Sequence, residues 1–300
     1  MSKRQPASLC VWACFLSLFL AMTFGSPAEA AKRAAPSRVP ELAERYSLIQ
    51  SAEVSGDRGK NVPETERLNR AVGEARKAAL RRAQQFLERK FRGVGFGYEI
   101  LRTAPEGAVR VLDRRTLGPD ETGRPRWRID MEVDYTFRPA SGSDAASRQA
   151  AIDRAGLLNV RLWTDKKQYR AGEPVTVYFE GNRDFYAKLV RITAGGAIEQ
   201  ILPNNYRQLS SFRKGVRYQA PGEGDRFVLS PPPGSRETFL IVASPYAMSH
   251  INMKTMAGGI YQYRSRWSSF ERAVRSGLTL GAEDVAEFFT AGCEIEVSLP

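Results

Sequence analysis

The stretch Arg126–Phe137, with the sequence RWRIDMEVDYTF, alternates between two kinds of side chain over its whole length. The apolar set consists of Trp127, Ile129, Met131, Val133, Tyr135 and Phe137. The polar set consists of Arg126, Arg128, Asp130, Glu132, Asp134 and Thr136. Because successive side chains of a strand point to opposite faces of a sheet, the stretch predicts an antiparallel strand with one buried face and one face in water.

Three carboxylates, Asp130, Glu132 and Asp134, lie at every second position of this polar face. Aligned carboxylates can bind calcium or work as an acid–base pair. Arg126 and Arg128 share the face and would neutralise acids on adjacent strands. We therefore interpret it as a solvated sheet face.

Working outward, Glu64–Arg92 predicts one long helix, with Asn61 as its cap, Pro63 in its first turn and Gly93 at its end. A narrow apolar stripe at helical spacing runs along it, formed by Leu68, Val72, Ala75, Ala79, Ala83 and Phe86. Further strands are expected at Tyr46–Val54, Tyr98–Thr103 and Ala108–Leu117. Residues 44–138 thus predict an α+β domain in which one long helix lies on an antiparallel sheet.

Small polar residues at Pro139–Ser147 indicate a linker over 139–155. Residues 156–300 are expected to form a second domain, an immunoglobulin-like β-sandwich, because short strands recur at intervals of about 10–15 residues. These strands are Val160–Trp163, Val175–Glu180, Phe185–Thr193, Ile198–Leu202, Arg226–Leu229 and Thr238–Ala243. Trp267–Ser276 and Ala282–Thr290 predict short helices, and alternation from Cys293 to Leu299 predicts a final strand.

Several ordered motifs of this second part resemble a known family. They are the run from Val160 to Glu173, Phe185–Tyr186, Gly195–Gly196, Ile201–Asn204 and Pro231–Glu237. Over residues 157–247 the chain resembles the bacterial domain-of-unknown-function family 4384. The resemblance implies an exported or fused β-sandwich accessory module and carries over no site residues. The N-terminal part, through its Ala-rich helix Ala75–Ala83 between strands, is weakly similar to the N-terminal domain of flagellar assembly protein T.

The first 30 residues predict a secretory signal peptide. Lys3 and Arg4 precede an apolar run over Leu9–Phe24, and Ala28-Glu29-Ala30 offers a cleavage site after Ala30. A membrane anchor is the alternative, but the run is shorter than the roughly 20 residues that a span needs. We expect a bacterial periplasmic or secreted protein whose mature chain begins with a loose segment, residues 31–43, and has no transmembrane segment.

Composition narrows the function. The chain of 300 residues carries a net charge of +12, one histidine and three cysteines. Cleavage would remove Cys10 and Cys14 and leave Cys293 alone, so no intrachain disulfide is expected. We expect no cofactor and no metal site, and we interpret His250 as an ordinary packing position.

Candidate binding residues fall in two places. Aromatic and basic side chains interleave at Tyr261, Tyr263, Arg264, Arg266 and Trp267. They could hold an anionic ligand, or the aromatics could pack the segment onto the domain. The predicted helix adds Arg67 and Arg81, the cations on its outer face with the fewest acidic neighbours.

These features favour a non-enzymatic cell-envelope protein that serves as a binding or assembly module. Its expected partner is an envelope protein or an anionic surface polymer, because export argues against nucleic acid despite the positive charge. The alternative is a hydrolase acting on an envelope polymer. The sequence contains no distinct nucleophile–base pair that would support it.

Overall fold

The computed structural model describes residues 44–56, 62–94, 98–101, 109–139, 145–276 and 285–299. The expected signal peptide and the loose segment at residues 31–43 lie outside these ranges. Within them the chain forms three α-helices, a twelve-stranded sheet and a three-stranded sheet. All but one of the strand pairs are antiparallel; the exception joins β6 (Gln168–Tyr169) to β15 (Val285–Val297).

The N-terminal part confirms the helix-on-sheet prediction. Helix α2 (Glu64–Phe91) covers one face of β1 (Arg45–Ser55) and β4 (Arg126–Pro139), which β2 (Tyr98–Leu101) and β3 (Val109–Leu117) extend. Ala75 and Ala79 of this helix are buried against the sheet, and Gln50 Nε2 of β1 donates to the Ala79 carbonyl at 3.0 Å. Small side chains permit this close approach. The helix ends as expected, since Gly93 adopts a φ of 83°.

The C-terminal part is rich in sheet. Its contribution to the large sheet consists of β6, β8 (Phe185–Ile192), β9 (Ile198–Leu202), β10 (Ser211–Phe212), β12 (Arg236–Ser244), β13 (Lys254–Thr255), β14 (Tyr261–Tyr263) and β15. The small sheet consists of β5 (Val160–Thr164), β7 (Val177–Gly181) and β11 (Tyr218–Ala220). Arg226–Leu229, expected as a strand, makes only an isolated bridge from Leu229 to Val175.

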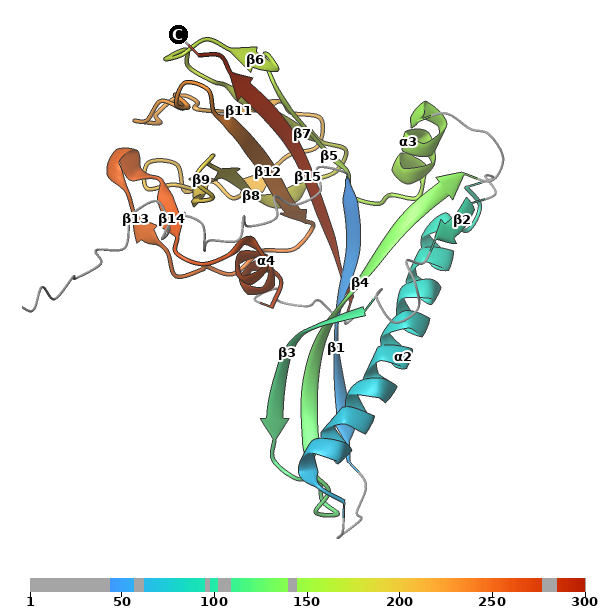
Figure 1. The fold of residues 1–300 in the computed structure, drawn as a ribbon. Coiled ribbons are helices and arrows are strands. Elements are labelled where there is room, and N and C mark those ends of the chain that lie inside the picture. The colour runs from blue at the N-terminus through green and yellow to red at the C-terminus, as the bar shows by residue number, and fades with distance from the viewer. Residues whose placement is uncertain are drawn as a thin grey trace, which may run out of the picture. The chain divides into compact units, whose positions relative to one another are not determined.

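Strand β1 joins the two parts into one sheet. It pairs with β4 on one side and with β15 on the other, as Figure 1 shows. The sheet therefore runs across the boundary expected at residues 139–155. In that segment Ala145–Arg154 forms helix α3 rather than an open linker.

The prediction of a helix at Ala282–Thr290 is wrong for the residues that the structure describes there. Residues 285–290 form the first half of β15, and all of them are buried. This strand pairs with β12 and β1 along its two edges, and both of its faces are covered, because Phe289 lies in one core cluster and Phe288 in another. Without a wet face the sequence loses its alternation, and an apolar run of this length resembles a buried helix.

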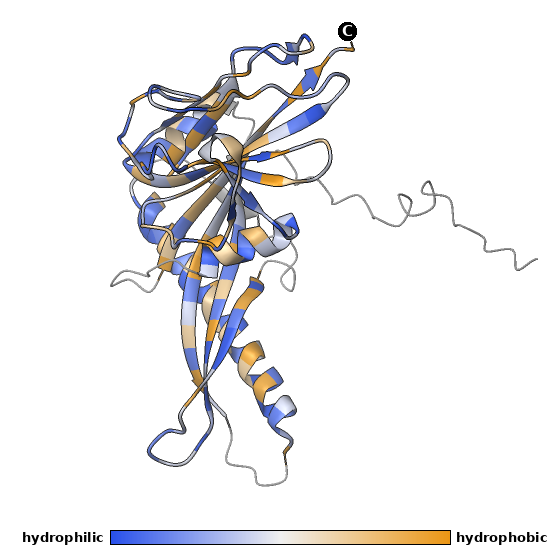
Figure 2. Ribbon diagram, turned by 90° about the vertical axis from the view of Figure 1, so that its left-hand side faces the viewer, coloured by the Kyte–Doolittle hydropathy of each residue, from blue (hydrophilic) through white to orange (hydrophobic). Residues whose placement is uncertain are grey.

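The large sheet is covered on both faces. One core cluster combines Ala79 of α2 with Phe179 of the small sheet and Phe239 of β12 on the same side. A second cluster lies on the opposite side, where helix α4 (Trp267–Ser276) places Phe270 and Val274 against Leu240. Figure 2 shows the alternating hydrophilic and hydrophobic bands along the long strands that supply both faces.

Candidate functional site

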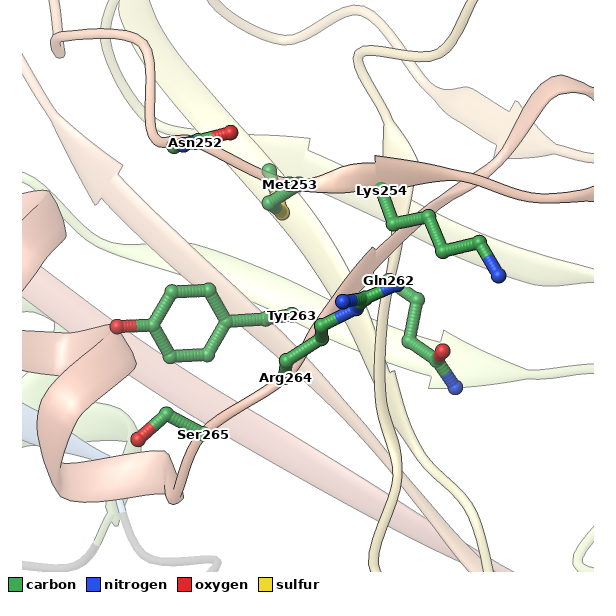
Figure 3. A pocket seen from close by; sticks show the side chains of 7 residues that line it. All are labelled: Asn252, Met253, Lys254, Gln262, Tyr263, Arg264 and Ser265. Carbon is green, nitrogen blue, oxygen red and sulfur yellow. The ribbon is translucent and has the colours of Figure 1, made fainter.

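An open pocket of about 340 Å³ lies where β13 and β14 diverge toward α4. It is lined by Asn252, Met253, Lys254, Gln262, Tyr263, Arg264 and Ser265. In Figure 3, Lys254 and Gln262 project on one side while the ring of Tyr263 points away from them. Lys254 and Gln262 are register partners, which fixes their side chains on one surface of the hairpin.

The aromatic residues expected at this segment serve mainly to build it. Tyr263 meets the ring of Phe270 edge-on, with centroids 5.4 Å apart, and buried Trp267 stacks on Phe270 at 5.3 Å. The Tyr261 hydroxyl donates to Asn205 Oδ1 at 2.6 Å. The packing alternative therefore holds for Trp267, which does not line the pocket, whereas Tyr263 both packs and forms part of the wall.

The cations of this segment are free to meet a ligand. Lys254, Arg264 and Arg266 are exposed, and none forms an ion pair with any acid in the described part of the chain. Arg264 lies in the pocket lining, whereas Arg266 follows just beyond it. The lining includes two cations and no carboxylate, so its charge attracts anions.

The two candidate binding residues of helix α2 differ in their exposure to solvent. Arg81 is exposed, as expected, whereas Arg67 is half-buried and its Nε is buried without a hydrogen-bond partner among described residues. Lys77 pairs with Glu74 at 3.0 Å, as its spacing predicts. The structure thus does not bring Arg67 and Arg81 together with the pocket, which belongs to other elements.

A buried ion cluster, which the sequence did not indicate, occupies the polar face of β4. Glu132 is completely buried and pairs with Arg45 of β1 at 3.2 Å and with Arg110 of β3 at 2.5 Å. Its third partner is the buried Arg275 of α4, at 2.6 Å. The expectation of a solvated face is wrong here, because α4 packs on it and its charges are neutralised internally.

Two more acids complete the cluster. Asp134 pairs with Arg45 at 3.1 Å, and Glu271 pairs with Arg45 and with Arg275, both at 3.0 Å. Burial and the neighbouring charge of Glu132 raise the pKa of Asp134 to about 6. The sequence of α4 could have indicated this cluster, because Glu271 and Arg275 share the apolar stripe of the helix with Phe270 and Val274. These groups pair with one another across β1, β4 and α4.

Three further titratable groups, His250, Lys188 and Cys293, lie on separate segments of the chain. His250 is exposed rather than packed, which corrects that expectation. Burial raises the pKa of the Cys293 thiol to about 11. Lys188 of β8 is buried without an ion pair to any described acid, and burial lowers its pKa to about 8. Within the described ranges no group of three or more metal-ligating side chains gathers.

Residues 168–246 match the model of the family described as Domain of unknown function (DUF4384). This match confirms the resemblance over most of the range where the sequence suggested it, and it ends before the pocket. No curated protein matches the chain. In the part that the structure describes, no helix combines the length and apolar character needed to cross a membrane.

Proposed function

We propose that this protein is an exported, non-enzymatic envelope protein that binds an anionic surface polymer at the pocket between β13, β14 and α4. The observation that carries the proposal is the pair of unneutralised cations, Lys254 and Arg264, in a lining without acids. Arg264 presents a planar fork that matches carboxylate or phosphate, and Lys254 adds a mobile point charge.

The lining supports a binder over a hydrolase. Its seven residues contain no carboxylate, imidazole or thiol, so the pocket lacks the groups that most often serve a hydrolase as general base or nucleophile. Tyr263 offers a rigid ring beside the cations, held by its contact with Phe270. We further propose that the β-rich C-terminal part is an immunoglobulin-like sandwich that acts as an accessory module and presents this pocket.

The test is binding to purified lipopolysaccharide, teichoic acid and peptidoglycan fragments at low and high salt. The double substitution Lys254→Gln with Arg264→Gln should weaken binding to at least one of them about tenfold at low salt, which corresponds to ~1.4 kcal/mol. High salt should reduce the difference. Arg76→Gln with Arg114→Gln is the matched control, because it removes two exposed cations that lie elsewhere.

Equal weakening by the pocket and control variants would show that net charge, not the pocket, governs binding. Crosslinking in intact cells separates a polymer from an acidic protein partner. Export has its own test, since N-terminal sequencing of the mature chain should begin at Ala31. A chain that keeps residues 1–30 in the membrane fraction would overturn the proposed location.

A further inference from the structure

A second aromatic and basic surface lies on the outer face of the small sheet. Trp163 of β5 and Tyr178 of β7 are register partners, and both are half-buried. Their neighbours Leu162 and Phe179 point the other way, into the core shared with the large sheet. The rings of Trp163 and Tyr178 therefore face outward from the small sheet.

Two arginines are arranged around the indole. The Trp163 and Tyr178 rings stack with centroids 5.9 Å apart and planes 19° from parallel. The guanidinium carbon of Arg161 lies 5.2 Å from the centroid of the Trp163 ring, and that of Arg217 lies 5.6 Å from it. Stacking of this kind holds a guanidinium in place while its N–H donors stay available at the edges.

The charges of these two arginines are not neutralised by ion pairs with the residues that the structure describes. Both are exposed, and neither forms an ion pair with an acid in the described ranges. Glu180 is opposite Arg161 in the register, and it forms no ion pair there either. Because both guanidinium groups lie over one ring, their carbons are at most about 11 Å apart. Two oriented forks at this separation suit neighbouring anionic groups on one chain.

We propose that Arg161, Trp163, Tyr178 and Arg217 form a binding surface for an acidic polysaccharide. The two guanidinium groups would pair with carboxylates on the sugars, and the exposed parts of the two rings would contact the apolar C–H surfaces between them. This deepens the proposed function by adding a second surface for the same class of polymer. The pocket's Tyr263 packs on the opposite face of the large sheet, so a short oligomer meets each surface separately.

The experiment measures binding of size-defined oligogalacturonate to the mature chain at low salt. Arg161→Gln with Arg217→Gln should weaken binding about tenfold, and Glu180→Gln should strengthen it by removing the nearest competing acid. The charge-matched control is Arg76→Gln with Arg114→Gln, which removes two exposed arginines and should change nothing, and Arg226→Gln is a second control. Arg226→Gln removes one exposed arginine that lies over a different ring, at 5.1 Å from the centroid of Tyr206.

Two further measurements make the result specific. Oligogalacturonate should change the tryptophan fluorescence of the parent and not that of Trp163→Phe, since Trp127 and Trp267 are buried. Neutral dextran should not bind. Polyglutamate carries the same charges without sugar rings, so binding of polyglutamate equal to that of oligogalacturonate would overturn the assignment to a polysaccharide.

Different results would refute the proposed pocket and the proposed second surface. If only Lys254→Gln with Arg264→Gln weakens binding, the proposed function stands and the second surface is refuted. If only Arg161→Gln with Arg217→Gln weakens it, the pocket is refuted and the second surface stands. Loss of similar size in both variants, with the fluorescence change confined to chains that keep Trp163, supports both.

Discussion

Strands β4 and β15 flank β1 on its two sides, yet the sequence predicts β4 as a strand and the first half of β15 as a helix. The alternation of β4 identifies it at once. The first half of β15 carries apolar side chains on both faces beside the buried Glu287 and Thr290, and it resembles a helix. Both strands are nevertheless buried on both faces at their centres, because Glu132 of β4 lies as deep as Ala286 of β15, although Arg128 near the start of β4 is exposed. Alternation therefore reports that two faces differ in polarity, and it does not report which face meets water.

The largest expected effect tests the buried polar face of β4. Glu132→Ala should lower the free energy of unfolding by about 3–5 kcal/mol, because it leaves buried cations without their partner. Urea unfolding followed by circular dichroism measures this loss. The control is Glu74→Ala, which removes an exposed ion pair with Lys77 and should cost less than about 1 kcal/mol. Similar losses in both variants would mean that the face behaves as a solvated one.

The apolar face should give a smaller effect. Ala79 is completely buried between α2 and the sheet, and its carbonyl accepts a hydrogen bond from Gln50. Ala79→Leu should destabilise the protein by about 1–3 kcal/mol, because added methyl groups force the helix away from the sheet. Ala78→Leu at the half-buried neighbouring position should cost clearly less in the same urea titration. An equal cost would show that the close approach is not needed.

The pH dependence of Asp134 has a definite sign. Its pKa, raised to about 6, means that the folded state holds the proton more tightly than the unfolded chain, where an aspartate titrates near about 3.9. This contribution is fully present below the unfolded pKa and is lost as the pH rises through about 6. Relative to Asp134→Asn, the parent should therefore lose stability between about pH 4 and pH 7.

Asp113→Asn is the control of opposite sign, because its hydrogen bond with Arg115 lowers the pKa of Asp113. Relative to that variant, the parent should gain stability as the pH rises from acid conditions. Urea unfolding of the parent and the two variants at about pH 4 and about pH 7 measures these changes. A parent and an Asp134→Asn variant with parallel pH profiles would exclude a raised pKa at this position.

The smallest effect is expected on the outer face of α2. Arg81→Glu should change stability by no more than about 0.5 kcal/mol, since its side chain is exposed. Arg67→Glu should cost more, because Arg67 is half-buried and its Nε is enclosed. Thermal unfolding of the two variants measures both losses of stability. A larger loss for Arg81→Glu than for Arg67→Glu would contradict the difference in burial between the two residues.

Much of the fold was predictable because local signals and burial agree there. Helix α2 carries its Ala stripe, β9 and α4 have the bounds that their sequences predict, and Gly93 ends the long helix. The pairing of β1 with β15 was not predictable, since more than 200 residues separate the strands and no local pattern encodes their contact.

The candidate site was predictable in part for a similar reason. The interleaved pattern at Tyr263 and Arg264 identified two pocket residues, but it could not show that Trp267 turns inward. Lys254 comes from the other strand of the hairpin, so only the register brings it to Gln262. The guanidinium groups of Arg161 and Arg217 both lie over Trp163, because the three-stranded sheet brings their segments together. The spacing of these residues in the sequence does not predict that arrangement.

The most direct test of the continuous sheet is the unfolding of residues 156–300 expressed alone. This fragment lacks β1, so residues 285–290 lose their pairing with that strand. Arg275 loses Glu132 as well. We predict that circular dichroism shows no cooperative thermal transition for the fragment, whereas residues 31–300 unfold in one transition. A β-rich fragment that unfolds cooperatively would contradict this account and support the independent C-terminal domain that the sequence predicts.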